Sequence, residues 1–434
     1  MKTYFLRSFG CQMNEHDAER IRAVLESEGL ARRETPEDAD VIVYNTCTVR
    51  RSADQRLAGH LSGAARLKRQ EPGRTIVVTG CLPQAEQAAF LAEYPFVDVA
   101  VGPQNLHRLA EALRAARGTT NSGQVALFDD GDAMSGDLPS RRERPFQAWV
   151  QIMSGCTNFC SYCIVPFVRG RERSRGADAI VAEVAALANR GVREVTLLGQ
   201  NVNAYGADLT ERPTFASLLR RLDVLPGLAR VRFMTSHPRD LSDELIAAVA
   251  ELPTVCEHVH LPLQSGSDRV LAAMNRGYTA DWYLARVRAL RSAVPNVSIT
   301  TDLIAGFPGE TEDDLADTLD LVQRAEFDAA FTFVFSARPG TAAASLPGQL
   351  PFEVQRERVQ RLIALTQDQA RERRTRLIGS MAEVLVEGPS RQPGRWRGRS
   401  RQNVVVNVAG TAQPGEIINA LITDATSTTL KGLA

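Results

Sequence analysis

Three cysteines close together in the chain are the residues best suited to carry out chemistry. Cys156, Cys160 and Cys163 follow the spacing C-x-x-x-C-x-x-C, directly after an apolar segment at residues 146–152. Iron–sulfur clusters that only carry electrons are held by four Cys thiolates, so a set of three leaves one iron with an open position. A small molecule can bind and react at such a position. The spacing therefore predicts a catalytic four-iron, four-sulfur (4Fe-4S) cluster.

A zinc knuckle or a set of buried structural thiols is the alternative for this loop. Structural zinc usually takes four ligands from C-x-x-C pairs, or Cys together with His. This segment offers three Cys, and no His lies nearby to complete a zinc site. The ligand count therefore favours the iron–sulfur cluster.

A second set of three cysteines lies in the first part of the chain. Cys11, Cys47 and Cys81 each follow the carboxyl end of a predicted strand. The carboxyl ends of parallel strands share one edge of a sheet, and ligands bind at that edge. Three buried core thiols are the alternative, because Cys is often a core residue. Their equivalent positions favour a second metal site with three thiolates and one open iron.

Three domains are predicted to position these cysteines. Residues 1–118 alternate strands and helices, which predicts an α/β domain with a doubly wound parallel sheet. Residues 119–141 have the Gly, Ser, Asp and Arg content of a linker. Residues 142–374 contain six further βα units, too few for a full barrel of eight, and predict an open, partial (β/α)6 barrel. Residues 375–434 consist of short strands punctuated by Gly and Pro, which predict a small β-barrel.

The hydrophobic pattern gives approximate element positions. The expected helices of the first domain lie at residues 15–28, 52–69, 84–91 and 105–116, and a long final helix is expected at 351–377. The predicted strands are at residues 3–9, 40–44, 75–79 and 96–101 in the first domain, at 146–152, 193–198, 229–234, 256–261, 297–303 and 329–335 in the second, and at 382–386, 403–408 and 417–422 in the third.

Composition limits the class of protein. The 434 residues include 51 basic and 51 acidic side chains, so a surface for nucleic acid must be local rather than global. No segment approaches the roughly 20 uncharged apolar residues of a membrane span, and the first residues are too short and polar for a signal peptide. The seven Cys are an odd number, which suits reduced thiols. We therefore expect a cytoplasmic protein without a membrane partner.

One strongly basic segment lies in the third domain. Residues 390–401 contain five Arg, one Trp and no acidic residue. Arg side chains suit phosphate contacts, and an aromatic ring suits base stacking. We expect a loop that binds RNA, with a merely solvated basic loop as the alternative. The candidate RNA-binding residues are Arg391, Arg395, Trp396, Arg397, Arg399 and Arg401.

These motifs together resemble the methylthiotransferases of the radical S-adenosylmethionine (SAM) superfamily over essentially the whole chain. The three-Cys loop, with the aromatic Tyr162 before its last Cys, is typical of the superfamily. The second three-Cys set and a terminal domain similar to the RNA-binding TRAM domain are typical of the methylthiotransferases. Gln12-Met13-Asn14 and residues 200–203, Gln-Asn-Val-Asn, resemble the tRNA 2-methylthio-dimethylallyladenosine synthases. The branches acting on a ribosomal protein or on threonylcarbamoyladenosine usually read Cys-Pro-Lys-Asn or Cys-Lys-Val-Asn after the first Cys.

The resemblance implies the cofactors and the reaction. It implies a 4Fe-4S cluster at each three-Cys set and SAM at the cluster of Cys156, Cys160 and Cys163. One SAM would methylate a sulfur held at the other cluster, and a second would be cleaved reductively to a 5′-deoxyadenosyl radical. The radical would remove hydrogen from carbon 2 of an isopentenylated adenine beside the tRNA anticodon, and the methylthio group would join that carbon. The resemblance also implies a reducing partner such as flavodoxin or ferredoxin, and a monomer.

Several further positions match the parts of the family that contact SAM. Arg175 is the candidate partner of the SAM carboxylate, in a bidentate geometry. Packing, an ordinary turn or a solvated charge is the alternative at each of these positions. The candidate SAM-binding residues are Tyr162, Arg175, Gly199, Gln200, Asn201, Ile304 and Gly306.

Other residues that could bind metal are expected to be structural. His237, His258 and His260 have no ligand partners at metal spacing, and Cys256 lies in an apolar strand. Two alternatives to the main function stay open. One is a methylthiotransferase with another substrate, and the other is a non-catalytic RNA-binding iron–sulfur protein that senses redox state. Formation of 5′-deoxyadenosine from SAM would exclude the sensor.

Overall fold

The computed structural model describes residues 2–10, 12–48, 51–118, 124–129, 134 and 138–434, with the backbone alone at 51–55 and 118. The chain divides into two compact units, which are described one at a time. The first unit comprises Met1–Glu143, Trp149–Thr157 and Cys163–Arg173, and the second comprises Arg144–Ala148, Asn158–Tyr162 and Ser174–Ala434. No helix in the described part of the chain has the length and apolar character that a membrane span requires.

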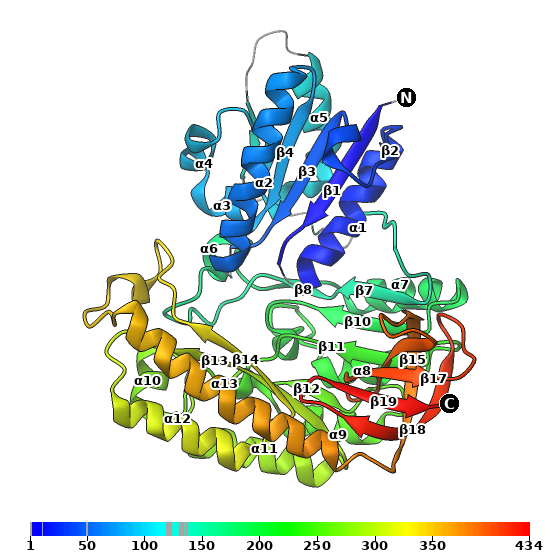
Figure 1. Cartoon of the computed structure of the whole chain (residues 1–434), viewed down its shortest axis with the longest axis vertical. Helices are drawn as coiled ribbons and strands as arrows, with labels where there is room; N and C mark the ends of the chain where they lie inside the picture. Colours follow the sequence, from blue (N-terminus) through cyan, green and yellow to red (C-terminus); the bar gives the residue numbers. More distant parts are fainter. Residues whose placement is uncertain (1, 11, 49–50, 119–123, 130–133, 135–137) are drawn as a thin grey trace. The chain divides into compact units, whose positions relative to one another are not determined.

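A six-stranded parallel sheet in the order β2-β1-β3-β4-β5-β6 forms the centre of the first unit (Figure 1). The order reverses between β1 and β3, which is the feature that places ligands at the carboxyl edge of doubly wound sheets. The strands are β1 (Thr3–Ser8), β2 (Ala31–Arg32), β3 (Val41–Thr46), β4 (Thr75–Gly80), β5 (Val99–Val101) and β6 (Val125–Leu127).

Helices cover both faces of this sheet because alternate strand residues enter two separate cores. Val41 and Val43 pack with α1 and α5, whereas Ile42 and Tyr44 pack with α2 and α4. The expected doubly wound sheet is thereby confirmed. The helices are α1 (Gln12–Ser27), α2 (Arg51–Gln70), α3 (Cys81–Glu86), α4 (Ala88–Glu93), the 3-10 helix η2 (Pro103–Arg108) and α5 (Leu109–Gly118).

Two expectations for this unit are wrong. The single helix expected at 84–91 is two helices, because the backbone turns at Gln87, where φ is +46°. The stretch 119–141, expected to be a linker, contributes β6, which pairs with β5 through Val99 and Val125. Three residues are too short a run to reveal a strand in a segment rich in Gly, Ser and Asp.

The second unit contains the open, partial barrel. Its two sheets have the orders β11-β10-β7 and β12-β13-β14, with β7 represented in this unit by Gln147 and Ala148. A bridge between Val231 and Val255 links β11 to the residues before β12. Each of the six expected strands has a counterpart in these two sheets, so this expectation is confirmed. The strands are β7 (Gln147–Gln151), β10 (Glu194–Leu198), β11 (Arg230–Phe233), β12 (His258–His260), β13 (Ser298–Ala305) and β14 (Ala329–Val334).

Capping side chains mark the first turns of α8 to α12. The side chains of Thr214, Ser242, Ser267 and Thr279 each accept a backbone N–H in the first turn, and Thr311 forms a reciprocal capping box with Asp314. The helices of this unit are α7 (Ala177–Asn189), α8 (Phe215–Asp223), α9 (Asp243–Glu251), α10 (Asp268–Ala273), α11 (Ala280–Ala293), α12 (Glu312–Ala325) and α13 (Phe352–Thr375).

The end of the chain forms a closed barrel in the order β15-β16-β17-β19-β18, as predicted. The basic segment is not simply a loop, because residues 395–400 form β16, which pairs with β15 and β17. Arg alternates there with Trp, Gly and Ser, a period of two that fits a strand with one outward basic face. The strands are β15 (Met381–Pro389), β16 (Arg395–Ser400), β17 (Val405–Ala409), β18 (Ile417–Ala425) and β19 (Thr429–Leu433).

Two buried arginines of β11 anchor the closed barrel to the partial barrel. Arg230 is fully buried and donates to Glu383 Oε1 at 3.0 Å and to the Arg399 carbonyl at 2.9 Å. Arg232 donates to the Ser400 carbonyl at 2.7 Å and to Glu194 Oε2 at 2.8 Å. Burial raises the pKa of the Glu194 carboxyl, but Arg232 and Arg230 outweigh it and hold that pKa below its ordinary value. The two barrels are therefore one packed unit.

We predict that Arg230→Met loosens the closed barrel. The variant keeps most of the side-chain volume but leaves buried carbonyls unpaired, which costs about 1–3 kcal/mol each. Hydrogen–deuterium exchange of the β15 and β16 amides should become faster. The matched control is Arg220→Met, which removes an exposed ion pair with Glu244 worth about 1 kcal/mol or less. Equal exchange in both variants would contradict the anchoring role of Arg230.

Candidate functional site

Cys47 and Cys81 lie side by side at the carboxyl edge of the first sheet. Each directly follows one of the register partners Thr46 and Gly80, the last residues of β3 and β4. Both are buried, with exposures of 3% and 5%. Cys11, the third predicted ligand of this set, lies outside the described residues. The described part of the set thus has the expected placement at the edge.

Two glycines allow the backbone to approach these cysteines closely. Gly10 has a φ of +130°, and a Cβ there would lie 2.3 Å from Cys47 Cβ. Gly80 has a φ of +101°, and a Cβ there would lie 2.2 Å from the Thr46 carbonyl oxygen. Only glycine tolerates both the backbone conformation and the contact. The turn that follows β1 is therefore held against Cys47.

A buried pair of asparagines ties these strand ends together. Asn14 Nδ2 donates to the Thr46 carbonyl at 2.8 Å, and Asn45 Nδ2 donates to the Asn14 carbonyl at 2.8 Å. Thr79 Oγ1 donates to Asn45 Oδ1 at 3.2 Å. In the sequence, Asn14 is only a marker of one branch, and no role is predicted for Asn45. Asn45 directly follows the apolar residues 41–44 and lies two residues before Cys47, and this placement was the available signal.

The three-Cys loop is shared between the two units. Cys156 and Cys163 belong to the first unit and Cys160 to the second. In the first unit, Ile164 and Val168 pack with Cys81. Helix α6 (Val165–Arg169) ends at Arg169, whose Nη2 lies 3.1 Å from Asp17 Oδ2 on α1. The segment after Cys163 is therefore fixed beside the candidate ligand Cys81.

In the second unit, the end of α10 holds the part of the loop that contains Cys160. The Ser161 N–H donates to the Met274 carbonyl at 3.0 Å, and Asn275 Nδ2 donates to the Phe159 carbonyl at 3.1 Å. Arg276 Nη1 lies 3.4 Å from Cys160 Sγ. Arg276 was not predicted, because the two residues are 116 positions apart in the sequence and only the fold brings their side chains together.

Three of the predicted SAM-binding residues lie in one region of the second unit. Tyr162 and Ile304 both pack against a buried cluster that includes Phe307. The backbone N–H groups of Gly306 and Phe307 both donate to Glu310 Oε2, which shapes the turn after β13. The structure therefore brings Tyr162, Ile304 and Gly306 to the carboxyl end of β13, the end at which barrel enzymes bind substrates.

The other predicted SAM-binding residues follow β10 or lie before α7. The Gly199 carbonyl accepts from Thr235 Oγ1 at 2.6 Å, and Asn201 Nδ2 donates to Asp240 Oδ2 at 2.8 Å. Gln200, between them, is half-buried. Arg175 Nη1 lies 2.7 Å from Glu183 Oε2, so its guanidinium already has a carboxylate partner. Gly199, Gln200 and Asn201 thus lie at the carboxyl end of their strand, as Gly306 does.

The histidines and Cys256, which are predicted to be structural, have neighbours from the protein itself or are buried. His258 and His260 both contact Thr300 Oγ1, and burial lowers the pKa of His237 to about 2. Cys256 is 1% exposed, and burial raises the pKa of its thiol.

The cysteines fit iron–sulfur clusters by ligand type and surroundings. Among the described residues, which leave out Cys11, no three His, Cys, Asp or Glu side chains stand close enough together to hold a metal. The fit therefore rests on thiolates being the preferred ligands of iron–sulfur clusters, and on the burial of Cys47 and Cys81 at neighbouring strand ends. Hydrogen bonds to ligand sulfurs are usual around such clusters, and Arg276 lies against the candidate ligand Cys160 in this way.

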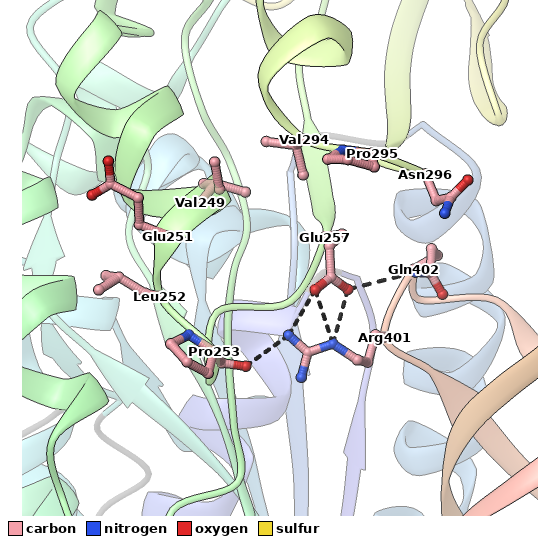
Figure 2. A pocket seen from close by; sticks show the side chains of 11 residues that line it. Val249, Glu251, Leu252, Pro253, Glu257, Val294, Pro295, Asn296, Arg401 and Gln402 are labelled. Atoms are coloured by element: carbon pink, nitrogen blue, oxygen red, sulfur yellow. Dashed lines mark hydrogen bonds and ion pairs between the residues drawn. The ribbon is translucent and has the colours of Figure 1, made fainter.

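The candidate RNA-binding arginines differ in their partners. Arg399 Nε donates to Glu387 Oε1 at 3.0 Å, and Arg397 lies 3.7 Å from the same carboxylate. Arg401 forms a two-pronged ion pair with Glu257 at 2.8 Å, inside a hollow lined by α9 and the residues before β13 (Figure 2). Among the described residues, no carboxylate pairs with Arg391 or Arg395. Trp396 is half-buried on β16.

Sequence profiles of known families match three parts of the chain. The profile of the Radical SAM superfamily matches residues 150–322. The profile described as Uncharacterized protein family UPF0004 matches residues 3–102, and the TRAM domain matches residues 375–434.

Curated relatives are similar over nearly the whole chain. A protein of Caldicellulosiruptor saccharolyticus is 47% identical over 94% of this chain and 87% of its own length. One of Pelotomaculum thermopropionicum is 45% identical over 100% of this chain and 98% of its own length. Both are named tRNA-2-methylthio-N(6)-dimethylallyladenosine synthase. Among solved structures, the radical SAM methyltransferase TsrM of Kitasatospora setae, 15% identical, shares the fold with a TM-score of 0.57 over 79% of this chain and 77% of its own.

We predict that Gly10→Ala lowers the amount of iron bound by the reconstituted chain. The added Cβ would collide with Cys47 Cβ, and the backbone conformation disfavours any side chain. Loss of one complete cluster would remove about four irons per chain. Gly73→Ala is the matched control, because a Cβ there meets nothing within 4 Å. The same iron content in both variants would contradict the placement of the turn against Cys47.

Proposed function

Because this chain belongs to the family of tRNA-2-methylthio-N(6)-dimethylallyladenosine synthases, within the Radical SAM superfamily, we propose that it adds a methylthio group to carbon 2 of dimethylallyladenosine next to the anticodon of tRNA. The observation that carries the proposal is the adjacent placement of Cys47 and Cys81 at the end of β3 and β4. A simple radical SAM enzyme needs only the loop of Cys156, Cys160 and Cys163. A second buried thiol set is what a sulfur-inserting enzyme requires in addition.

The cofactors are a 4Fe-4S cluster at the three-Cys loop, SAM, and a second 4Fe-4S cluster that includes Cys47 and Cys81. When bound, they would supply reductive cleavage of SAM and the sulfur chemistry of methylthio transfer, while the protein supplies position and surroundings. The reaction would also need an electron from a reducing partner such as flavodoxin or ferredoxin. We further propose a monomer that acts in the cytoplasm, the compartment of its tRNA substrate.

The chain's own residues would bind SAM at the carboxyl ends of β10 and β13. The turn shaped by Glu310 presents the backbone of Gly306, and Ile304 offers an apolar contact to the adenine. Tyr162 packs against the same cluster and would lie against the ring. Asn201 is held by Asp240 and by the His237 N–H, so the Gly199–Asn201 turn is pre-organised. Arg175 would reach the SAM carboxylate only by exchanging its partner Glu183.

The closed barrel would bind tRNA through the arginines that pair with no carboxylate among the described residues. Arg391 and Arg395 are therefore the strongest phosphate contacts, and Trp396 on β16 is the candidate stacking residue. Arg397 and Arg399 share Glu387, and Arg401 is neutralised by Glu257. We propose that Arg397 and Arg399 contribute less to tRNA binding and that Arg401 contributes least.

Single Cys variants should separate the two sites. Cys160→Ala should abolish both 5′-deoxyadenosine formation and methylthio transfer, because the radical cluster is lost. Cys47→Ala should keep 5′-deoxyadenosine formation but abolish methylthio transfer. The measurement is mass spectrometry of reactions with SAM, a reductant and isopentenylated tRNA. The Cys256→Ala chain, which lacks a thiol assigned to the core, should do both reactions. Methylthio transfer by Cys47→Ala would contradict the proposal.

Removal of Arg391 and Arg395 should flatten the salt dependence of tRNA binding. Each phosphate contact contributes about 0.7–0.9 to the log–log salt slope, so the double Ala variant should lose about 1.4–1.8. Arg401→Ala is the comparison and should leave the slope unchanged, because Glu257 already neutralises that charge. Titrations at several salt concentrations would measure both. A larger loss in Arg401→Ala than in the double variant would overturn this assignment.

A further inference from the structure

A buried guanidinium faces one of the three cysteines of the radical loop. Arg276 lies just after α10, is 4% exposed, and places Nη1 3.4 Å from Cys160 Sγ. The same nitrogen lies 3.5 Å from the hydroxyl of Tyr162. All three residues belong to the second unit.

The guanidinium is held firmly in this orientation. Its Nη2 donates to the Pro262 carbonyl at 2.7 Å, and its Nε donates to the Tyr278 hydroxyl at 2.9 Å. The Tyr278 hydroxyl is fixed in turn by the Leu263 carbonyl at 2.9 Å. With two of its three nitrogens bound to fixed groups, Arg276 has little freedom to turn Nη1 away from Cys160.

Among the described residues, the charge of Arg276 has no carboxylate as a counter-ion. In the described part of the chain, its hydrogen-bond partners are carbonyl, hydroxyl and thiol groups, and no carboxylate pairs with it. A buried cation without an anion is costly. A thiolate bound to an iron–sulfur cluster would supply the missing negative charge at Cys160.

We propose that Arg276 is a positioning residue that donates a hydrogen bond to the Cys160 thiolate and raises the reduction potential of the cluster bound there. The inference rests on the proposed function, which places a cluster at Cys160. Reduction adds one electron from an external reductant and breaks no bond, so the cluster gains one negative charge. A fixed positive charge beside a ligand sulfur stabilises that reduced form more than the oxidised form.

The test is a redox titration followed by electron paramagnetic resonance. The parent is the full-length chain with Cys47→Ala and Cys81→Ala, in which the radical cluster alone remains, and dithionite is the reductant. Arg276→Gln should lower the ratio of reduced to oxidised cluster about tenfold at the parent's midpoint potential, which corresponds to a shift of about 59 mV. Arg276→Lys keeps the charge but loses the planar fork, so its shift should be smaller.

Asn275→Gly is the matched control. It removes the neighbouring hydrogen bonds to the Asn158 and Phe159 carbonyls without touching sulfur, and glycine tolerates the φ of +57° at this position. Its midpoint should equal that of the parent.

The remaining outcomes distinguish failure of the proposed function from failure of this inference. A parent chain without a cluster signal would contradict the proposed function itself. A parent with a signal, and an unchanged midpoint in Arg276→Gln, would overturn this inference alone. An equal shift in Asn275→Gly would also overturn it. Failure of both Arg276 variants to bind iron, with normal binding in Asn275→Gly, would show that Arg276 is needed for folding of the loop and not for the potential.

Discussion

The parallel pairing of β3 with β4 is the constraint on which the candidate chemistry depends. In-register pairing of Thr46 with Gly80 places Cys47 and Cys81 next to each other, although 33 residues separate them in sequence. Antiparallel pairing would have sent the two thiols to opposite edges of the sheet. The same rule operates in the partial barrel, where parallel strands bring the turn after β10 and the turn after β13 to one end.

Buried arginines hold the closed barrel and the partial barrel together. Arg230 and Arg232 donate to carbonyls of the closed barrel, and Arg401 returns from that barrel to Glu257. These guanidinium groups act as multiple donors, a role in which Lys would serve poorly because it lacks the planar fork. Arg276 differs because its partners in the described structure include no carboxylate. The basic side chains of this neutral protein therefore cannot be read as an RNA surface from composition alone.

Most of the architecture followed from the sequence, because the hydrophobic period and the Gly and Pro breaks are strong in the long elements. The short strands β2 and β6 escaped prediction, and β16 was hidden because its Arg content suggested a solvated loop. For the site, the sequence placed Cys47 and Cys81 correctly at strand ends. It could not show that Arg401 pairs with Glu257 or that Arg276 faces Cys160, because such contacts exist only after distant segments pack.

The nucleosides in tRNA from cells that lack this gene would test the proposed function most directly. We propose that the thiols at the sheet edge and the loop containing Cys160 serve one modification of tRNA. We predict that dimethylallyladenosine without the methylthio group accumulates, and that the methylthio form returns when the intact gene is restored. An unchanged tRNA profile, together with loss of a modification on a ribosomal protein, would contradict it.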